Sequence, residues 1–232
     1  MAQPTDSIRS LLADVADLVL SRECTGCGSV GPLLCPGCRR DVLSVQRHHV
    51  RAGPGGLPPI VVASVYEGLA QRLVIAHKEH GMLGLTGDLG SMLALAITAL
   101  SAGPVVIVPV PPHRDTVARR GIDTLDAIAR SSAGRLRAGS TGAEVVPLLR
   151  RRTDAGRHVG STASQRQAKV HGTMEVDHRK AEKLRPGHHI IVVDDVVTTG
   201  ATVAEAVRAL ADAGLQVGGI AAVAATPSRQ GS

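Results

Sequence analysis

The segment from Ile190 to Thr202 constrains the fold of this chain more than any other feature. An apolar run, Ile190–Val193, leads into Asp194 and Asp195 and then into Val-Val-Thr-Thr-Gly-Ala-Thr, ahead of a helical pattern. Apolar residues on both faces indicate a buried strand of a parallel sheet, and ligands of open α/β sheets bind at the carboxyl ends of such strands. The segment therefore predicts a strand, a loop and a helix that together form a binding site.

The residue types of this loop are suited to a phosphorylated sugar. Backbone N–H groups at a helix N-terminus favour a phosphate, Gly200 lets the backbone approach closely, and the threonine hydroxyls add donors. Asp194 and Asp195 suit the two vicinal hydroxyls of a ribose, either directly or through Mg²⁺. The loop has neither the Gly-Lys-Ser/Thr of a Walker A motif nor the Gly-x-Gly-x-x-Gly of a dinucleotide fold. The competing interpretation is a strand that happens to end in acids and threonines.

Strand and helix patterns alternate along the rest of the chain. Short β-branched apolar runs predict strands, and amphipathic stretches predict helices. The predicted strands cover 60–66, 104–109, 144–149, 188–193 and 216–222, and the predicted helices cover 69–79, 86–100, 116–133 and 203–213. This order predicts an α/β fold with a central, mostly parallel sheet flanked by helices. Residues 150–173 are polar, basic and without periodicity, which is typical of a functional or disordered loop.

All four cysteines lie close together in a C-x2-C-x7-C-x2-C pattern formed by Cys24, Cys27, Cys35 and Cys38. Two such pairs can place four thiolates tetrahedrally around one Zn²⁺ ion. Disulfides and free buried thiols are the alternatives, and disulfides are rare in the cytosol. Because four cysteines complete the coordination shell, the predicted zinc ion is structural rather than catalytic.

The cysteines belong to a predicted N-terminal module, residues 1–55, ahead of a main domain, residues 60–232. Residues 52–59 are rich in glycine and proline, as expected of a linker. Apolar residues also recur at helical spacing before the cysteines, namely Ile8, Leu11, Leu12, Val15, Leu18 and Val19. The module is therefore predicted to be a helix followed by a zinc knuckle.

The chain is basic, and its positive charge is concentrated in the middle of the sequence. Residues 113–152 hold nine Arg against four acids, and residues 153–189 hold seven Lys or Arg against four acids, whereas the whole chain has a formal charge of +6. A solvated surface, a polyanionic small substrate and nucleic acid are all compatible with this pattern. The single aromatic residue, Tyr66, argues against nucleic-acid binding by base stacking.

The sequence gives no sign of a membrane segment. No apolar run reaches the length of a transmembrane helix. Asp6, Asp14 and Asp17 interrupt the N-terminal stretch that a signal peptide would keep apolar. We therefore expect a cytoplasmic protein without membrane insertion.

The loop after the 188–193 strand resembles the phosphoribosyl pyrophosphate (PRPP) signature of type I phosphoribosyltransferases. The resemblance is unbroken over an apolar strand, Asp-Asp, two apolar residues and Thr-Thr-Gly. It implies a type I phosphoribosyltransferase fold that binds PRPP with Mg²⁺. It also implies that Asp194 and Asp195 bind the ribose hydroxyls, and that the 5-phosphate is held by Thr198, Thr199, Gly200, Ala201 and Thr202.

Over nearly its full length, the chain is also similar to the ComF family. The cysteine pairs, the Val65–Gly68 block with Lys78 downstream, and Pro109-Val110-Pro111 ahead of Arg119-Arg120-Gly121 resemble successive blocks of that family. In related transferases the loop after the first core strand contacts pyrophosphate. This implies a pyrophosphate loop formed by Val110, Pro111, Pro112, His113 and Arg114.

Phosphoribosyl transfer breaks a C1–O bond, so cations must stabilise the pyrophosphate that leaves. Our catalytic candidates are Arg114 and, within the basic loop that would close over the substrate, Arg166 and then Lys169. His77 and Lys78 are expected to be packing and solvated positions of a helix. The chain departs from the ComF pattern at Ile122-Asp123-Thr124, where the family commonly has Phe-Asn-Gln, and at Lys169, where it commonly has Asn.

The sequence favours a phosphoribosyltransferase that uses an unidentified acceptor and releases pyrophosphate. The ComF resemblance also implies a role in natural competence and the handling of single-stranded DNA. The alternative is therefore a non-catalytic protein that binds PRPP, a nucleotide or single-stranded DNA and serves the DNA-uptake machinery.

Overall fold

The computed structural model describes residues 23–44, 49–51, 56–112, 121–152, 171–184 and 187–227. Its centre is a six-stranded sheet with the strand order β1-β2-β8-β7-β3-β4. Neighbouring strands are parallel except for the edge strand β1 (His49–Arg51), which pairs antiparallel with β2 (Ile60–Val65). The other strands are β3 (Val105–Pro109), β4 (Ala143–Val145), β7 (His189–Val197) and β8 (Val217–Ala225). The predicted α/β fold with a central parallel sheet is confirmed.

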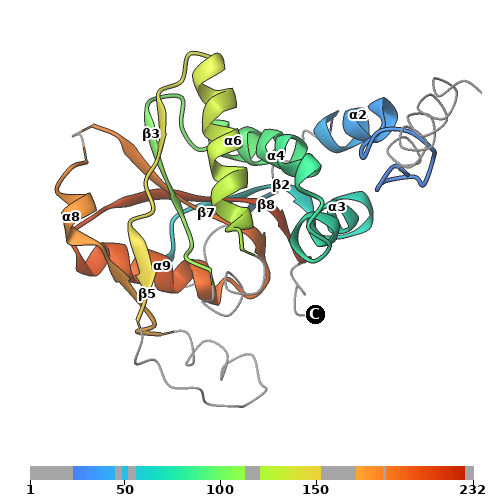
Figure 1. Ribbon diagram of the computed structural model, residues 1–232. Helices are drawn as coiled ribbons and strands as arrows, with labels where there is room; N and C mark the ends of the chain where they lie inside the picture. Colours follow the sequence, from blue (N-terminus) through green and yellow to red (C-terminus); the bar gives the residue numbers. More distant parts are fainter. Residues whose placement is uncertain are drawn as a thin grey trace, which may run out of the picture.

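Helices cover both faces of the sheet (Figure 1). Helices α4 (Thr86–Thr98) and α6 (Thr124–Ala138) lie on one face, whereas α9 (Ala201–Asp212) lies on the other. Alternate residues of β7 serve the two faces: Ile191 packs with the α4 side and Val192 with the α9 side. Because the chain contains no Phe or Trp, aliphatic side chains fill both cores.

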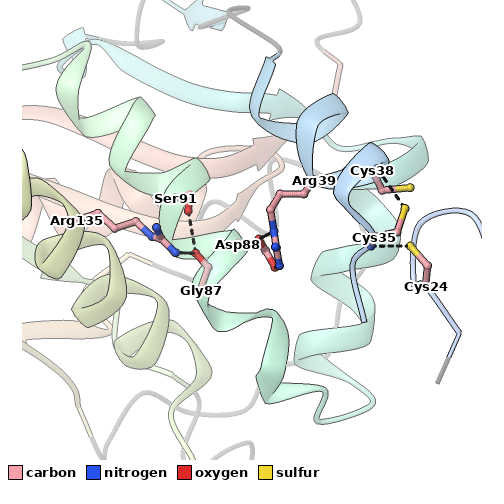
Figure 2. A network of polar contacts seen from close by, with 8 residues as sticks. All are labelled: Cys24, Cys35, Cys38, Arg39, Gly87, Asp88, Ser91 and Arg135. Carbon is pink, nitrogen blue, oxygen red and sulfur yellow. Dashed lines mark hydrogen bonds and ion pairs between the residues drawn. The ribbon is translucent and has the colours of Figure 1, made fainter. Parts of the chain in front are cut away.

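The cysteine-containing segment packs against the side of the sheet that carries α4. Its helix, α2 (Pro36–Ser44), contacts α3 (Gly68–Lys78) and α4. Arg39 of α2 donates to both carboxylate oxygens of Asp88 in α4, at 2.6 and 3.1 Å. Figure 2 shows this ion pair beside the contact in which Arg135 of α6 donates to the carbonyl oxygen of Gly87, at 2.8 Å. Polar contacts thus join α2 to α4 and α4 to α6.

A small hairpin lies outside the main sheet. Strands β5 (Leu149–Arg151) and β6 (Met174–Val176) pair antiparallel, and the short helix α8 (His178–Ala181) follows. The buried carboxylate of Glu205 in α9 accepts a hydrogen bond from the backbone N–H of Met174, at 3.0 Å, and pairs with Arg208. This contact fixes β6 to α9.

Strand β7 is longer than predicted. It was expected to end at residue 193, but it continues to Val197. The reason is its pairing with β8, which includes Asp194 with Ala222 and Val196 with Ala224. The two acids therefore lie within the strand rather than beyond its end.

Two other predicted boundaries are wrong. The helix expected over 116–133 begins at Thr124 and ends at Ala138, since Gly121 has a φ of +70° and Asp123 caps the helix; residues 116–120 lie outside the described residues. The strand expected over 144–149 is two strands, because β4 ends before Pro147, which has no N–H to donate, and β5 follows it. β5 also contains the start of the stretch predicted to be a loop.

The remaining predicted strands and helices of the main domain are present. The predicted N-terminal helix lies outside the described residues, and the division into a 1–55 module and a 60–232 domain stays a prediction. Within the part of the chain that the structure describes, no helix is both long and apolar enough to span a bilayer.

Candidate functional site

A cavity of about 430 Å³ opens at the carboxyl ends of the central strands. Its lining includes Val110, Pro111 and Pro112 after β3, Asp194 and Asp195 of β7, and Thr198 and Thr202 from the turn and helix that follow. These residues were predicted from sequence to form one site. Sheet order explains why they meet, because β3 and β7 are adjacent and parallel.

The turn between β7 and α9 directs a helix N-terminus toward this edge of the sheet. Gly200 precedes α9 with a φ of +79°, a conformation that side chains rarely adopt. The backbone N–H of Ala201 lies 3.4 Å from the Thr199 hydroxyl, which accepts from it. Thr199, Gly200 and Ala201 therefore form the turn between the lining residues Thr198 and Thr202.

The two carboxylates are held by neighbouring backbone groups. Asp194 Oδ1 accepts from the N–H of Asp195, and Asp195 Oδ1 accepts from the N–H of Val196, both at 2.8 Å. Burial and the adjacent Asp195 carboxylate raise the pKa of Asp194 to about 8. Asp194 is therefore poised to lose a proton when a cation or a hydrogen-bond donor binds.

Lys78 enters the site from the last turn of α3. Its Nζ atom lies 2.6 Å from Asp195 Oδ2, and its side chain lines the cavity. The expectation that Lys78 is simply a solvated position is wrong, because the end of α3 points it at β7. His77 beside it is buried as expected; its Nε2 lies 2.8 Å from the Thr86 hydroxyl, and burial lowers its pKa.

Arg151 is a second cation of the cavity. The sequence placed it among the basic residues of the 150–173 stretch but did not single it out. It ends β5, lines the cavity, and donates from Nε to the carbonyl oxygen of Pro111 at 3.1 Å. Burial lowers its pKa, while the Asp194 and Glu205 carboxylates oppose that shift. The run Arg150-Arg151-Arg152 after an apolar pair was the available signal. Only the fold shows which of the three lines the cavity.

Other residues that line the cavity are of mixed character. Tyr66, Ile122 and Asp123 contribute to it. Asp123 Oδ1 accepts from the N–H groups of Leu125 and Asp126, both at 3.1 Å, and so caps α6. Burial raises the pKa of Asp123, although those backbone groups oppose the shift. Tyr66 is the only aromatic residue of the chain, and its place in the lining could not be predicted from sequence.

Some predicted residues lie outside the described part of the chain. They are His113 and Arg114 of the predicted pyrophosphate loop and Arg166 and Lys169 of the basic loop. Their proposed roles stay predictions.

Residues 114–232 match the family model for the phosphoribosyl transferase domain, which is half of the chain. The chain belongs to the phosphoribosyl transferase family. It is 40% identical over 67 residues to an adenine phosphoribosyltransferase of Streptomyces clavuligerus, covering 29% of this chain and 37% of that protein. It is 44% identical over 57 residues to an orotate phosphoribosyltransferase of Bacillus caldolyticus, covering 25% of this chain and 26% of that protein. The matched stretches thus span between about a quarter and just over a third of these two relatives.

The phosphoribosyl transferase match begins after α3, so it contains Asp194, Asp195 and Arg151 but neither Lys78 nor Tyr66. The segment before the match therefore contributes side chains to the same cavity.

The four cysteines also lie outside the match, and they form a cluster able to hold a metal ion. The sulfurs of Cys24, Cys27, Cys35 and Cys38 lie within 4.8 Å of one another. A Cβ atom at Gly26 would lie 2.5 Å from Cys38 Sγ, so only glycine fits beside that sulfur.

Backbone amides support the sulfurs of this cluster. Cys24 Sγ accepts from the N–H groups of Gly26 and Cys35, at 3.4 and 3.3 Å, and Figure 2 shows Cys24, Cys35 and Cys38 facing one another. Burial opposes ionisation of Cys24, but backbone N–H groups outweigh it and lower the pKa to about 6. Burial and the neighbouring sulfurs raise the pKa of Cys38 to about 12. The cluster thus favours the thiolate form at Cys24 and opposes it at Cys38. Zn²⁺ would stabilise the thiolate form of both, because thiolates are its preferred ligands.

Proposed function

We propose that this protein binds PRPP in the cavity at the end of β7 and transfers the phosphoribosyl group to an acceptor. The observation that carries the proposal is the paired carboxylates of Asp194 and Asp195, which line the cavity beside the N-terminus of α9 in a chain of the phosphoribosyl transferase family. Carboxylates accept hydrogen bonds from vicinal hydroxyls, and helix N-termini attract phosphate.

The geometry supports a binding mode in which different parts of the cavity contact different parts of PRPP. The 5-phosphate would lie against the turn from Thr198 to Thr202, and the ribose hydroxyls against Asp194 and Asp195. The pyrophosphate would then lie toward Pro111 and Pro112, next to the guanidinium of Arg151. Opposite ends of the ligand thus contact the ends of two adjacent parallel strands, β7 and β3.

In the transfer, the bond from C1 of the ribose to the pyrophosphate oxygen breaks, and its electron pair leaves with the pyrophosphate. A lone pair of the acceptor forms the new bond to C1. Arg151 is placed to stabilise the departing charge, and its contact with the Pro111 carbonyl fixes the guanidinium against the loop after β3. When Mg²⁺ is bound, it adds positive charge to the leaving group, and the oxygens of Asp194 and Asp195 are the hard ligands that this ion prefers.

We propose further that the chain is a ComF family member with a structural zinc ion. The support is the cluster of Cys24, Cys27, Cys35 and Cys38, which lies next to α3 and α4 rather than apart from the domain. The single-stranded DNA alternative rests on the ComF resemblance and the basic charge of the chain. No contact among the described residues favours it.

Pyrophosphate release tests the catalytic part of the proposal. The protein is mixed with PRPP, Mg²⁺ and a panel of acceptors that includes nucleobases, ammonia and primary amines. We expect release that depends on one class of acceptor and is lost in the Asp194→Asn, Asp195→Asn double variant. If PRPP binds but no acceptor stimulates release, the transferase is ruled out in favour of a PRPP-binding protein.

A further inference from the structure

Lys78 meets the carboxylate pair from a helix that lies outside the phosphoribosyl transferase match. It is the last residue of α3, and its Nζ atom is 2.6 Å from Asp195 Oδ2. Both residues line the cavity. The ammonium group is therefore part of the proposed ligand site and does not act on it from a distance.

Both carboxylate oxygens of Asp195 already have a partner. Its Oδ1 accepts from the backbone N–H of Val196 at 2.8 Å, and its Oδ2 faces Lys78. The Asp195 side chain is 10% exposed, whereas that of Lys78 is 38% exposed. A metal ion or a ribose hydroxyl that reaches Asp195 Oδ2 must share this oxygen with the ammonium or displace it.

Lysine is suited to such an exchange. Its ammonium is a compact charge with three donors on a flexible stem, so it can leave one acceptor and find another within the same cavity. The charges that line the cavity also need balancing. Among the described residues that line the cavity, four are acids, namely Asp194, Asp195, Glu79 and Asp123, and two are cations, Lys78 and Arg151. Arg151 also donates to the carbonyl oxygen of Pro111.

We propose that Lys78 occupies the place of a divalent cation at Asp195, so that the carboxylate pair is charge-balanced when empty and binds PRPP with little help from metal at that position. This inference rests on the proposed PRPP function. A purely structural ion pair between α3 and β7 would stabilise the fold without changing how the site responds to metal. The metal response therefore separates the two roles.

The first experiment measures Mn²⁺ alone, by the loss of its free electron-paramagnetic-resonance signal. Lys78→Met should bind Mn²⁺ about tenfold more tightly than the wild type, because a positive unit charge next to the buried Asp195 carboxylate is removed. Lys78→Arg retains the charge and should match the wild type. Lys180→Met, which removes a lysine of similar exposure from the Asp177 pair of α8, should also match it. Equal Mn²⁺ affinity in Lys78→Met and the wild type would overturn the proposal.

The second experiment measures PRPP affinity by calorimetry at low and at saturating Mg²⁺. Lys78→Met should lose about tenfold in affinity at low Mg²⁺ and regain it at saturating Mg²⁺, because metal replaces the missing charge. An affinity loss that Mg²⁺ does not restore would mean a structural role and would overturn the proposal. If the wild type binds no PRPP at all, the proposed function fails, and the Mn²⁺ experiment still decides whether Lys78 occupies the cation position.

Discussion

Asp194 and Asp195 place two neighbouring carboxylates in the last part of β7, which ends at Val197 before the turn into α9. Burial and the charge of Asp195 work against ionisation of Asp194, whose pKa rises from 3.8 to about 8. A residue that only served the fold would gain from being neutral. The arrangement is therefore costly for the folded state above neutral pH, and a ligand that shares the charge would offset this cost.

This conflict predicts a pH-dependent gain in stability for Asp194→Asn. Because the folded pKa lies above the unfolded one, the proton on Asp194 contributes stability that is fully present below the unfolded pKa and is lost as the pH rises toward about 8. The variant should therefore melt a few degrees above the wild type near pH 9 and gain less near pH 5. Melting curves across this range provide the measurement. Asp212→Asn, an exposed acid of α9, is the control, and an equal gain at both pH values would contradict the account.

From sequence alone, candidate residues can be grouped into one site most readily where they lie close together along the chain. Asp194, Asp195 and Thr198 are neighbours in one strand-loop-helix unit, so their chemistry could be interpreted without a fold. Lys78 and Arg151 reach the same cavity from α3 and β5, and only tertiary packing brings them there. Arg166 and Lys169 were chosen over Arg151 as catalytic candidates because the sequence does not show which side chains of the 150–173 stretch point toward the site.

At the scale of elements, α3 joins the cysteine cluster to the candidate site. Leu69, near the start of α3, packs against the cysteine cluster. A Cβ atom on Gly26 would collide with both Cys38 Sγ and Leu69 Cδ1, so the helix packs tightly against the cluster. Its other end carries Lys78. Loss of the cysteine cluster should therefore loosen a helix that contributes directly to the cavity.

We expect Cys35→Ser to lose bound zinc and to melt at a lower temperature. The wild type should contain about one Zn²⁺ per chain, because four thiolates complete a tetrahedral shell and such sites supply folding energy. Metal analysis and melting curves test this, and hydrogen exchange should increase in α2 and α3. Ser44→Ala, at the exposed end of α2, is the control. A zinc-free wild type with the same melting curve as Cys35→Ser would exclude the structural metal.

The long, strongly apolar elements were predictable, and their ends were not. β3 and β8 were recognised from β-branched and apolar runs, whereas β7 continues through two acids because β8 pairs with Asp194, Val196 and Val197. The start of α6 depended on the cap at Asp123. The β5–β6 hairpin was missed, because its two short strands are separated by a long polar stretch and are recognisable only as a pair.

At the scale of the whole molecule, the cysteine segment and the sheet share one hydrophobic core. Leu34 and Val42 pack in the same cluster as Leu89 of α4, and the Arg39–Asp88 ion pair closes the contact. The parallel α/β class and the grouping of the four cysteines were predictable from sequence. The strand order and this docking were not, because they depend on contacts between distant segments. Residues before the phosphoribosyl transferase match reach its site because β2 pairs with β8 and α3 follows β2.

Calorimetric titration of PRPP with Mg²⁺ tests the central claim most directly. The wild type should bind, and the Asp194→Asn, Asp195→Asn double variant should bind at least about tenfold to a hundredfold more weakly, since each lost charge-assisted hydrogen bond costs about 1.5–3 kcal/mol. The double variant should keep its fold, with melting no lower than that of the wild type, and Asp212→Asn should bind as the wild type does. Equal affinity in the double variant, or no binding by the folded wild type, would contradict a PRPP site at the end of β7.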